Sequence, residues 1–132
     1  MSILIGLHIK RMLEQEEAVT RYVGNRIFPV VAPLGVDDFP FVGYDMSGGT
    51  GDSTKDGTTD DVVTVQISVV AKSYEEAILI GNAVRYAFEG KTAVYEEFAV
   101  TECANVTYND EYFDNIEAYA LNLNIDFRTE DY

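Results

Sequence analysis

Histidine, cysteine and clustered carboxylates are the residues of this sequence that could do chemistry, and their spacing decides which chemistry. His8 is the only histidine and Cys103 the only cysteine. Neither has a second His, a second Cys or a carboxylate at the spacing of a zinc site or a catalytic triad. We therefore expect His8 on a helix surface or partly packed, and Cys103 as a buried or half-buried thiol of a strand.

Two stretches resemble ligand-binding loops only superficially. Asp52, Asp56, Asp60 and Asp61 lie close together in sequence, but no register gives the oxygen ligands and the glycine that a calcium-binding EF-hand loop requires. The Gly48–Gly51 segment lacks the Lys-Ser/Thr pair and the helix start of a phosphate-binding loop. A solvated loop explains both features better than a metal or nucleotide site does.

Adjacent carboxylates occur at Glu75–Glu76, Glu96–Glu97 and Asp110–Glu111. Neighbouring residues of a helix or strand point in different directions and do not converge on one bond, so surface charge is the preferred interpretation. The sequence thus predicts no catalytic, cofactor-binding or metal site. A hydrolase would need a deep pocket with converging carboxylates of perturbed pKa.

Length and charge limit the class of protein further. The 132 residues, 47% of them hydrophobic, suit one soluble globular domain spanning residues 1–132. No apolar run approaches the roughly 20 residues that span a membrane, which favours a cytosolic product. The net charge of −14 disfavours binding to nucleic-acid phosphates. Residues 1–36 carry four cations and three anions, a net +1, whereas residues 37–132 carry −15.

Helical periodicity appears in two parts of the chain. Residues 2–15 place Ile5, Ile9 and Leu13 on one face, with Ser2 as the expected cap, and a second stretch runs from about Glu16 to Gly24. The central helix is the strongest prediction. Ser73 and Glu76 form a capping box before an apolar face that ends at Gly90.

Strand periodicity appears in five segments. They are residues 26–31, where Pro29 indicates a sheet edge, residues 40–46, residues 61–72, residues 98–108 and residues 116–128. Residues 109–115 are the polar connection of an expected hairpin. Residues 47–61 contain no apolar side chain, so we expect a long, mobile loop there. Val65 and Ile80 are expected core residues.

The order of these elements predicts an α+β fold of two layers. A largely antiparallel sheet has only one apolar face, and the N-terminal and central helices would pack on that face.

This order resembles the tail-completion, or tail-terminator, proteins of long-tailed bacteriophages and prophages over nearly the whole chain. The matching features are an N-terminal helix, residues 23–29, Ala32–Pro33, Pro40–Val42, the strand of residues 62–71 leading into the helix at Ser73, and Tyr112 with the last strand. Only the acidic segment 47–61 departs from the family pattern by its length.

The resemblance implies a structural, non-enzymatic protein of the virion tail, made in the host cytoplasm. Identical subunits, commonly six, would form a ring that caps the tail tube and touches a head–tail connector protein. The alternative is an acidic binding module, either an inhibitor that mimics DNA or an adaptor for a basic partner. A closed ring on the tail tube favours the first interpretation, and a monomer bound to a basic protein favours the second.

Overall fold

The computed structural model describes residues 4–29, 39–53 and 59–131, without the side chains of residues 47–61, 104 and 131. Three helices lie in the described part: α1 (Ile5–Gln15), α2 (Glu17–Val23) and α3 (Tyr74–Phe88). The strands are β1 (Ile27–Pro29), β2 (Phe41–Ser53), β3 (Thr59–Ala71), β4 (Ala93–Val94), β5 (Phe98–Phe113) and β6 (Ala118–Asp131).

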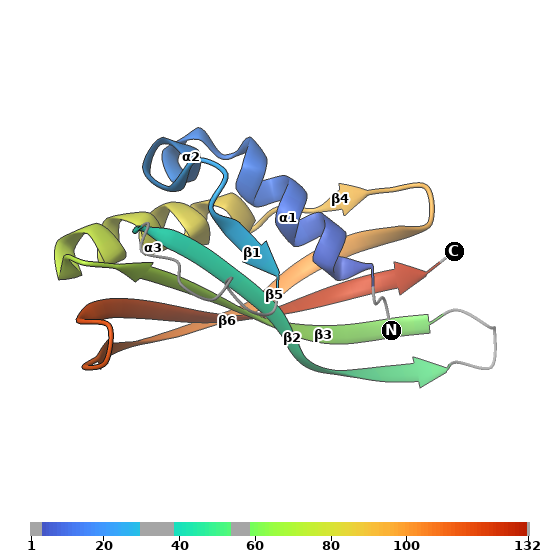
Figure 1. The fold of residues 1–132 in the computed structure, drawn as a ribbon. Coiled ribbons are helices and arrows are strands. Elements are labelled where there is room, and N and C mark those ends of the chain that lie inside the picture. The colour runs from blue at the N-terminus through green and yellow to red at the C-terminus, as the bar shows by residue number, and fades with distance from the viewer. Residues whose placement is uncertain (1–3, 30–38, 54–58, 132) are drawn as a thin grey trace.

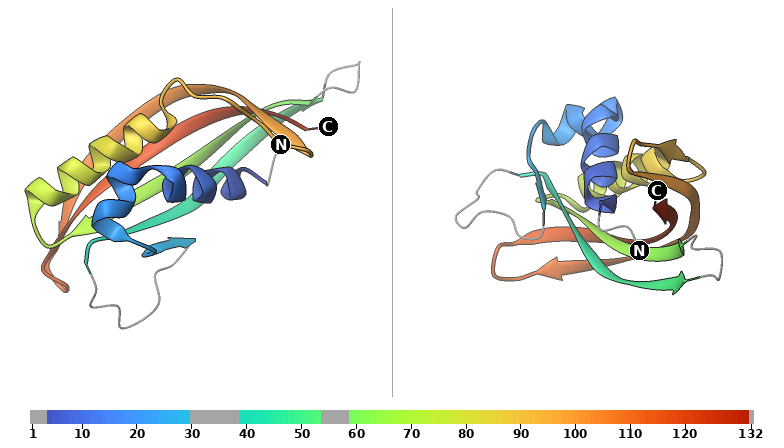
Figure 2. Two further views of the ribbon diagram at one scale, coloured as in Figure 1. Left: turned by 90° about the horizontal axis from the view of Figure 1, so that it is seen from above. Right: turned by 90° about the vertical axis from the view of Figure 1, so that its right-hand side faces the viewer.

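The strands form one curled sheet in the order β1-β2-β3-β6-β5-β4. Every described pairing is antiparallel except that of β1 with β2, which is parallel. The three helices all lie over one face of this sheet (Figures 1 and 2). The predicted α+β fold is therefore confirmed, as is the edge position of the short strand that contains Pro29.

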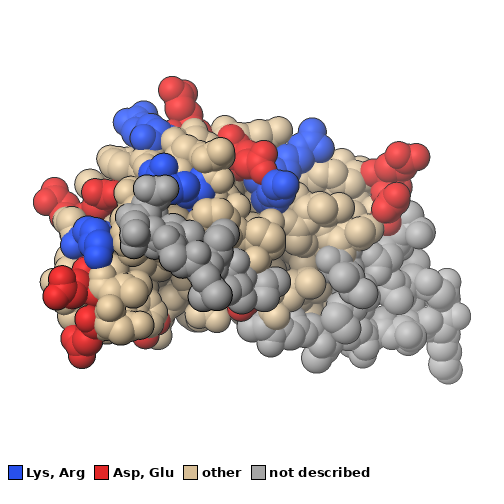
Figure 3. All heavy atoms as spheres, in the orientation of Figure 1, with Lys and Arg blue, Asp and Glu red and all other residues tan. Residues whose placement is uncertain are grey.

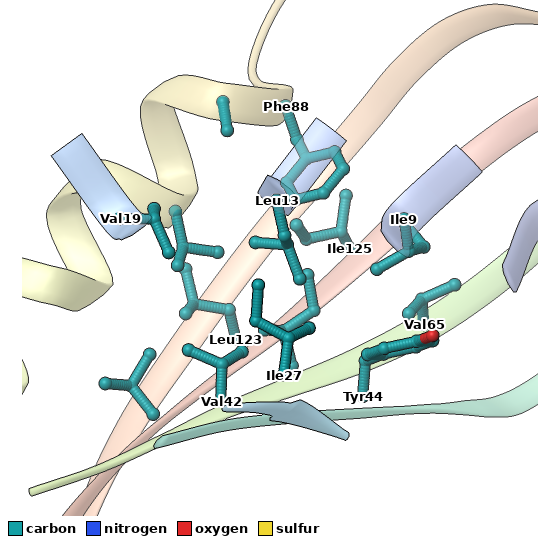
Figure 4. Close-up of a cluster of buried hydrophobic side chains, with 14 of the residues drawn as sticks. Ile9, Leu13, Val19, Ile27, Val42, Tyr44, Val65, Phe88, Leu123 and Ile125 are labelled. Carbon is teal, nitrogen blue, oxygen red and sulfur yellow. The ribbon is translucent and has the colours of Figure 1, made fainter. Parts of the chain in front are cut away.

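The core lies between the helices and the sheet (Figure 4). Ile5, Ile9 and Leu13 are fully buried because their spacing of four residues places them on one side of α1. Alternate residues of β3 and β6 meet them from the sheet, among them Val65, Leu123 and Ile125. The expected core residues Val65 and Ile80 have exposed fractions of 1% and 0%.

Helix α3 approaches the sheet closely at Gly81. A Cβ atom at this position would lie 1.9 Å from Cδ2 of Leu121 on β6, which is far inside van der Waals contact. An alanine here would therefore force the Leu121 side chain to move, although the backbone conformation would accept it. The periodicity of α3 placed Gly81 on the apolar face but gave no sign of this contact.

The ends of the helices follow the sequence prediction in two of three cases. The hydroxyl of Ser73 accepts a hydrogen bond from the Glu76 amide at 3.5 Å, and α2 ends at Gly24 with a φ of 59°. The prediction that Ser2 caps the first helix is wrong. Helix α1 begins at Ile5 with Leu4 as N-cap and without a side-chain cap, and Ser2 lies outside the described residues.

The prediction of a loop over residues 47–61 is wrong for most of that range. Strand β2 continues to Ser53 and β3 begins at Thr59, with a register shift between Met46 and Gly48. Pairing with β3, which β6 holds from its other side, outweighs the poor strand propensity of the glycines. Residues 54–58 lie outside the described residues, and the mobility of the segment stays a prediction.

The predicted hairpin near the C-terminus is confirmed, but its connection is shorter than expected. Strand β5 extends to Phe113, so most of residues 109–115 are paired with β6, and the turn lies between Phe113 and Ala118. Glu117 takes a φ of 50° in this turn. Polar side chains suggested a loop here because this part of β5 is exposed on both faces.

Candidate interaction surfaces

The single histidine lies inside the protein. Only 1% of the His8 surface is exposed, and its ring is surrounded by the rings of Tyr95, Phe88 and Phe127 at centroid distances of 5.6, 6.0 and 5.9 Å. Its Nδ1 atom lies 2.6 Å from the Tyr95 hydroxyl. Burial, with a smaller effect from the Arg11 charge, lowers the pKa of His8 from 6.5 to about 4. The prediction of a surface or partly packed histidine is wrong, because His8 is a neutral core residue.

The single cysteine is half-buried on β5, as predicted. Burial raises the pKa of the Cys103 thiol, and the carboxylates of Glu89, Glu102 and Asp126 add to that effect. A thiol with a raised pKa is a poor nucleophile at neutral pH, because the thiolate is the reactive species.

The paired carboxylates diverge in the way that their spacing predicted. Asp110 accepts a hydrogen bond from the Tyr74 hydroxyl at 2.8 Å on the helix side of the sheet. Its neighbour Glu111 accepts one from Asn122 at 2.8 Å on the opposite side. Within the described residues, no three His, Cys, Asp or Glu side chains are grouped to hold a metal ion. The side chains of Asp52, Asp56, Asp60 and Asp61 lie outside the described part.

A row of exposed aromatic side chains follows the junction between α3 and β5. Tyr74, Ile78 and Arg85 recur along one side of the helix, and Tyr108, Asp110 and Tyr112 alternate along the strand beside them. We call these six residues the tyrosine seam. Exposed fractions are 48% for Tyr74, 64% for Tyr108 and 48% for Tyr112. The seam includes a shallow hollow of about 180 Å³ next to Gly81.

The seam is internally ordered by side-chain contacts. The Tyr74 and Tyr112 rings both pack against the half-buried ring of Tyr119, with centroid distances of 5.7 and 4.9 Å. The Asp110 hydrogen bond raises the pKa of the Tyr74 hydroxyl. Because these contacts limit side-chain motion, less entropy would be lost when a partner covers the seam.

A second surface lies at the opposite edge of the sheet, where α1 passes over β1 and β2. A groove of about 500 Å³ opens there. We call it the N-terminal groove; its lining includes Leu4, Leu7, Lys10, Tyr44, Asp45 and Met46. Leu7 is 64% exposed and Met46 is 48% exposed, so the groove presents two large apolar side chains to solvent.

The face of the sheet without helices has an apolar cluster around Val70 and Ala120 and a polar part that is hydrogen-bonded across three strands. Thr64 on β3 donates to Asp126 on β6 at 2.6 Å, and Asn105 on β5 donates to the same carboxylate at 3.3 Å. A second row runs parallel to the first. Ser68 donates to Asn122 at 2.6 Å, and Asn122 donates to Glu111. These bonds satisfy polar groups that the sequence placed opposite the apolar face.

Charge is distributed unevenly over the molecule. Residues 101–117, which include most of β5 and the following turn, contain five carboxylates and no Lys or Arg. Cationic side chains lie mainly over the helices, interspersed with carboxylates, and several carboxylates gather at the end where α3 begins (Figure 3). The five carboxylates of residues 101–117 therefore lie on or near the seam, whereas Lys10 and Asp45 both line the groove and Arg11 lies over the Tyr95 ring.

The fold presents two exposed surfaces at opposite edges of one sheet, an arrangement suited to assembly with other subunits. The sequence matches the family described as Tail completion protein gp17 over residues 8–130, and the chain belongs to this family. It is therefore a structural protein of the phage virion tail, as the sequence resemblance indicated.

Comparison with solved structures gives the same fold. A chain of the virion of a native gene transfer agent particle superposes with a TM-score of 0.75 at 17% identity, with 92% of this chain and 91% of that chain covered. No curated protein shows significant sequence similarity to this chain. In the described part of the chain, no helix is both long enough and apolar enough to cross a membrane.

Sequence patterns predicted only part of the candidate surfaces. Of the aromatic residues near the C-terminus, Tyr112 is exposed in the seam whereas Tyr119 and Phe113 are half-buried. Tyr132 lies outside the described residues. Tyr74 and Tyr108 were missed, because their common position depends on how α3 crosses the sheet. A pattern of Tyr108, Asp110 and Tyr112 at period two was the available signal.

Proposed function

We propose that copies of this protein associate head-to-tail into a closed ring that caps the tail tube, ends its growth and presents a docking face to a head–tail connector protein. The ring would contain about six subunits, following the family pattern. The protein would act by geometry alone, with no cofactor and no catalysis.

The observation that carries this proposal is the position of two unlike surfaces at opposite edges of one sheet. The tyrosine seam lies beside β5, and the N-terminal groove lies beside β1 and β2. A contact between different surfaces repeats from copy to copy and closes when the rotation between neighbours divides a full turn. Membership of the tail completion family supports the same conclusion.

The acidic charge has a use in such a ring. A lumen that carries carboxylates repels DNA phosphates, so the genome could pass through the ring without adhering to it. A net charge of −14 also makes free subunits repel each other. We therefore expect the ring to dissociate readily in dilute solution and to be stable on the tail tube.

Electron microscopy of tail tubes tests this proposal. Purified subunit is mixed with assembled tubes that lack a terminator, and the tube ends are imaged. A ring at one end of each tube supports the proposal. Bare ends at saturating subunit, or subunit bound along the tube wall, would overturn it. A stable complex of the monomer with a basic protein would instead favour an acidic inhibitor or adaptor.

A further inference from the structure

We propose that the tyrosine seam of one copy binds the N-terminal groove of the next copy, and that this contact closes the ring. The inference rests on the proposed function and adds to it the two surfaces and their orientation. Both surfaces are built from described side chains, and each is exposed in the isolated subunit.

The composition of the seam is that of a protein contact. Tyrosine and arginine are enriched at the centres of interfaces, because their large side chains gain much from burial and also have polar groups to pair. Tyr108 and Tyr112 expose about half of their surface or more. Arg85 lies among them, held by Glu89 through hydrogen bonds of 2.8 and 3.3 Å.

The sheet edge beside the seam is also open. Strand β4 pairs with β5 only at Ala99 and Val100, so in the described part of the chain no strand covers the outer edge of β5 from Thr101 to Phe113. A long uncovered edge leaves backbone N–H and C=O groups free to pair with another chain. A partner on the seam would cover this edge.

The Lys10 ammonium at the groove gives a second copy one point of attraction to the acidic seam. The seam lies within the segment of five carboxylates at residues 101–117, whereas the groove is lined by the cation Lys10 and by a single carboxylate, Asp45. Lys10 lies 3.9 Å from Glu14, and because both side chains are more than half exposed this ion pair contributes little. The Lys10 ammonium can therefore approach a carboxylate of a neighbouring copy.

Shape supports the same pairing. Each surface combines a protruding side chain with a hollow: Tyr108 beside the smaller hollow, and Leu7 beside the groove. Tyr108 of one copy can enter the groove of the next while Leu7 of that copy covers the hollow next to Gly81. Because the two surfaces lie at opposite edges of the sheet, the contact repeats in one direction and does not form a two-fold dimer.

Cysteine cross-linking on the tail tube tests this contact. In a Cys103→Ser background, Leu7→Cys and Tyr108→Cys are combined in one chain, assembled on tubes and treated with a short bis-maleimide. We expect a ladder of covalent oligomers from dimer up to the full ring. Each single variant should stay monomeric, and a mixture of the two should stop at dimers. Circular dichroism before assembly checks that every variant is folded.

The matched control replaces Tyr86, which is 66% exposed and lies on α3 outside the seam. Leu7→Cys with Tyr86→Cys should give at least tenfold less cross-linked product than the seam pair. In addition, Leu7→Glu should weaken capping at least tenfold by placing an anion next to the acidic seam, while Tyr86→Glu should cap tubes normally.

Failures of the two proposals can be told apart. If rings form on the tubes but the seam pair does not cross-link, or either single variant forms dimers, the assignment of the contact is wrong and the terminator function stands. Cross-links from Tyr108→Cys to the tube protein would place the seam against the tube instead. If no ring forms at all, both proposals fail.

Discussion

The buried histidine makes the stability of this protein depend on pH in a way that can be calculated. His8 has a pKa of about 4 in the folded protein and about 6.5 in the unfolded chain. Between these values the unfolded chain binds more protons, so the free energy of unfolding falls as pH falls. The contribution of His8 is fully present above pH 6.5 and is lost progressively below it.

The linkage relation gives the size of the effect. Lowering the pH from 7.5 to 5.5 should reduce the free energy of unfolding by about 1.3 kcal/mol through protonation of His8. The complete loss below pH 4 is about 3 kcal/mol. The 23 Asp and Glu residues contribute in the opposite direction as acid removes their mutual repulsion. A comparison with a variant that lacks only the imidazole isolates the histidine.

The assay is urea unfolding of the wild type and His8→Gln at both pH values, followed by circular dichroism. Glutamine can keep a hydrogen bond to the Tyr95 hydroxyl but does not titrate. We expect the wild type to lose about 1.3 kcal/mol more than the variant on acidification. Equal losses would refute the assignment of a neutral core histidine.

A direct measurement uses the fact that the sequence contains one histidine. Its imidazole gives a single set of NMR signals, which can be followed from pH 7.5 downward in the folded protein. A midpoint near 4 is expected. A midpoint near 6.5, with the fold intact, would show that the ring is hydrated and that the calculated effect does not exist.

Three further predictions concern packing and charge. Gly81→Ala should lower the free energy of unfolding by about 1 kcal/mol, because overpacking against Leu121 outweighs the gain in helix propensity. Gly6→Ala on α1, where a Cβ meets nothing within 4 Å, should raise the free energy of unfolding by up to about 1 kcal/mol. Urea unfolding measures both changes. Val65→Asp and Ile80→Asp should each abolish soluble expression because a buried carboxylate would lack a partner, while Leu79→Asp at a 49% exposed position should remain soluble. Raising the salt concentration should increase the oligomeric fraction of concentrated subunit in sedimentation, since screening weakens the repulsion between copies; a decrease would show that attraction between unlike charges dominates.

Apolar periodicity was sufficient to predict the helices and strands that bury one face. The alternation in β3 and β6 and the spacing of four in α1 identified the core, because each pattern has a single way to face the helix–sheet boundary. The cap at Ser73 and the glycine at the end of α2 depend only on neighbouring residues in the sequence, so they could also be predicted.

Features that depend on residues far away in the sequence could not be predicted from local patterns. Gly48 and Gly49 are in a strand only because β3 and β6 extend alongside them. His8 was predicted to be a surface or partly packed residue because it has no ligand or triad partner at suitable spacing, and only the positions of Tyr95 and Phe127 show that it is enclosed. The seam likewise joins residues 74–85 to residues 108–112, which no local pattern relates.

The polar bonds on the open face of the sheet also determine how its strands align. The apolar face alone would permit β3 and β6 to slide by two residues, because Val63, Val65, Ile67 and Val69 are nearly equivalent opposite a row of equally large apolar residues. On the other face, Thr64 must meet Asp126 and Ser68 must meet Asn122. A slide by two residues would separate Asn122, with only 6% of its surface exposed, from Ser68. The helix side thus supplies most of the stabilisation, and the side without helices selects one alignment among several that would bury the same core.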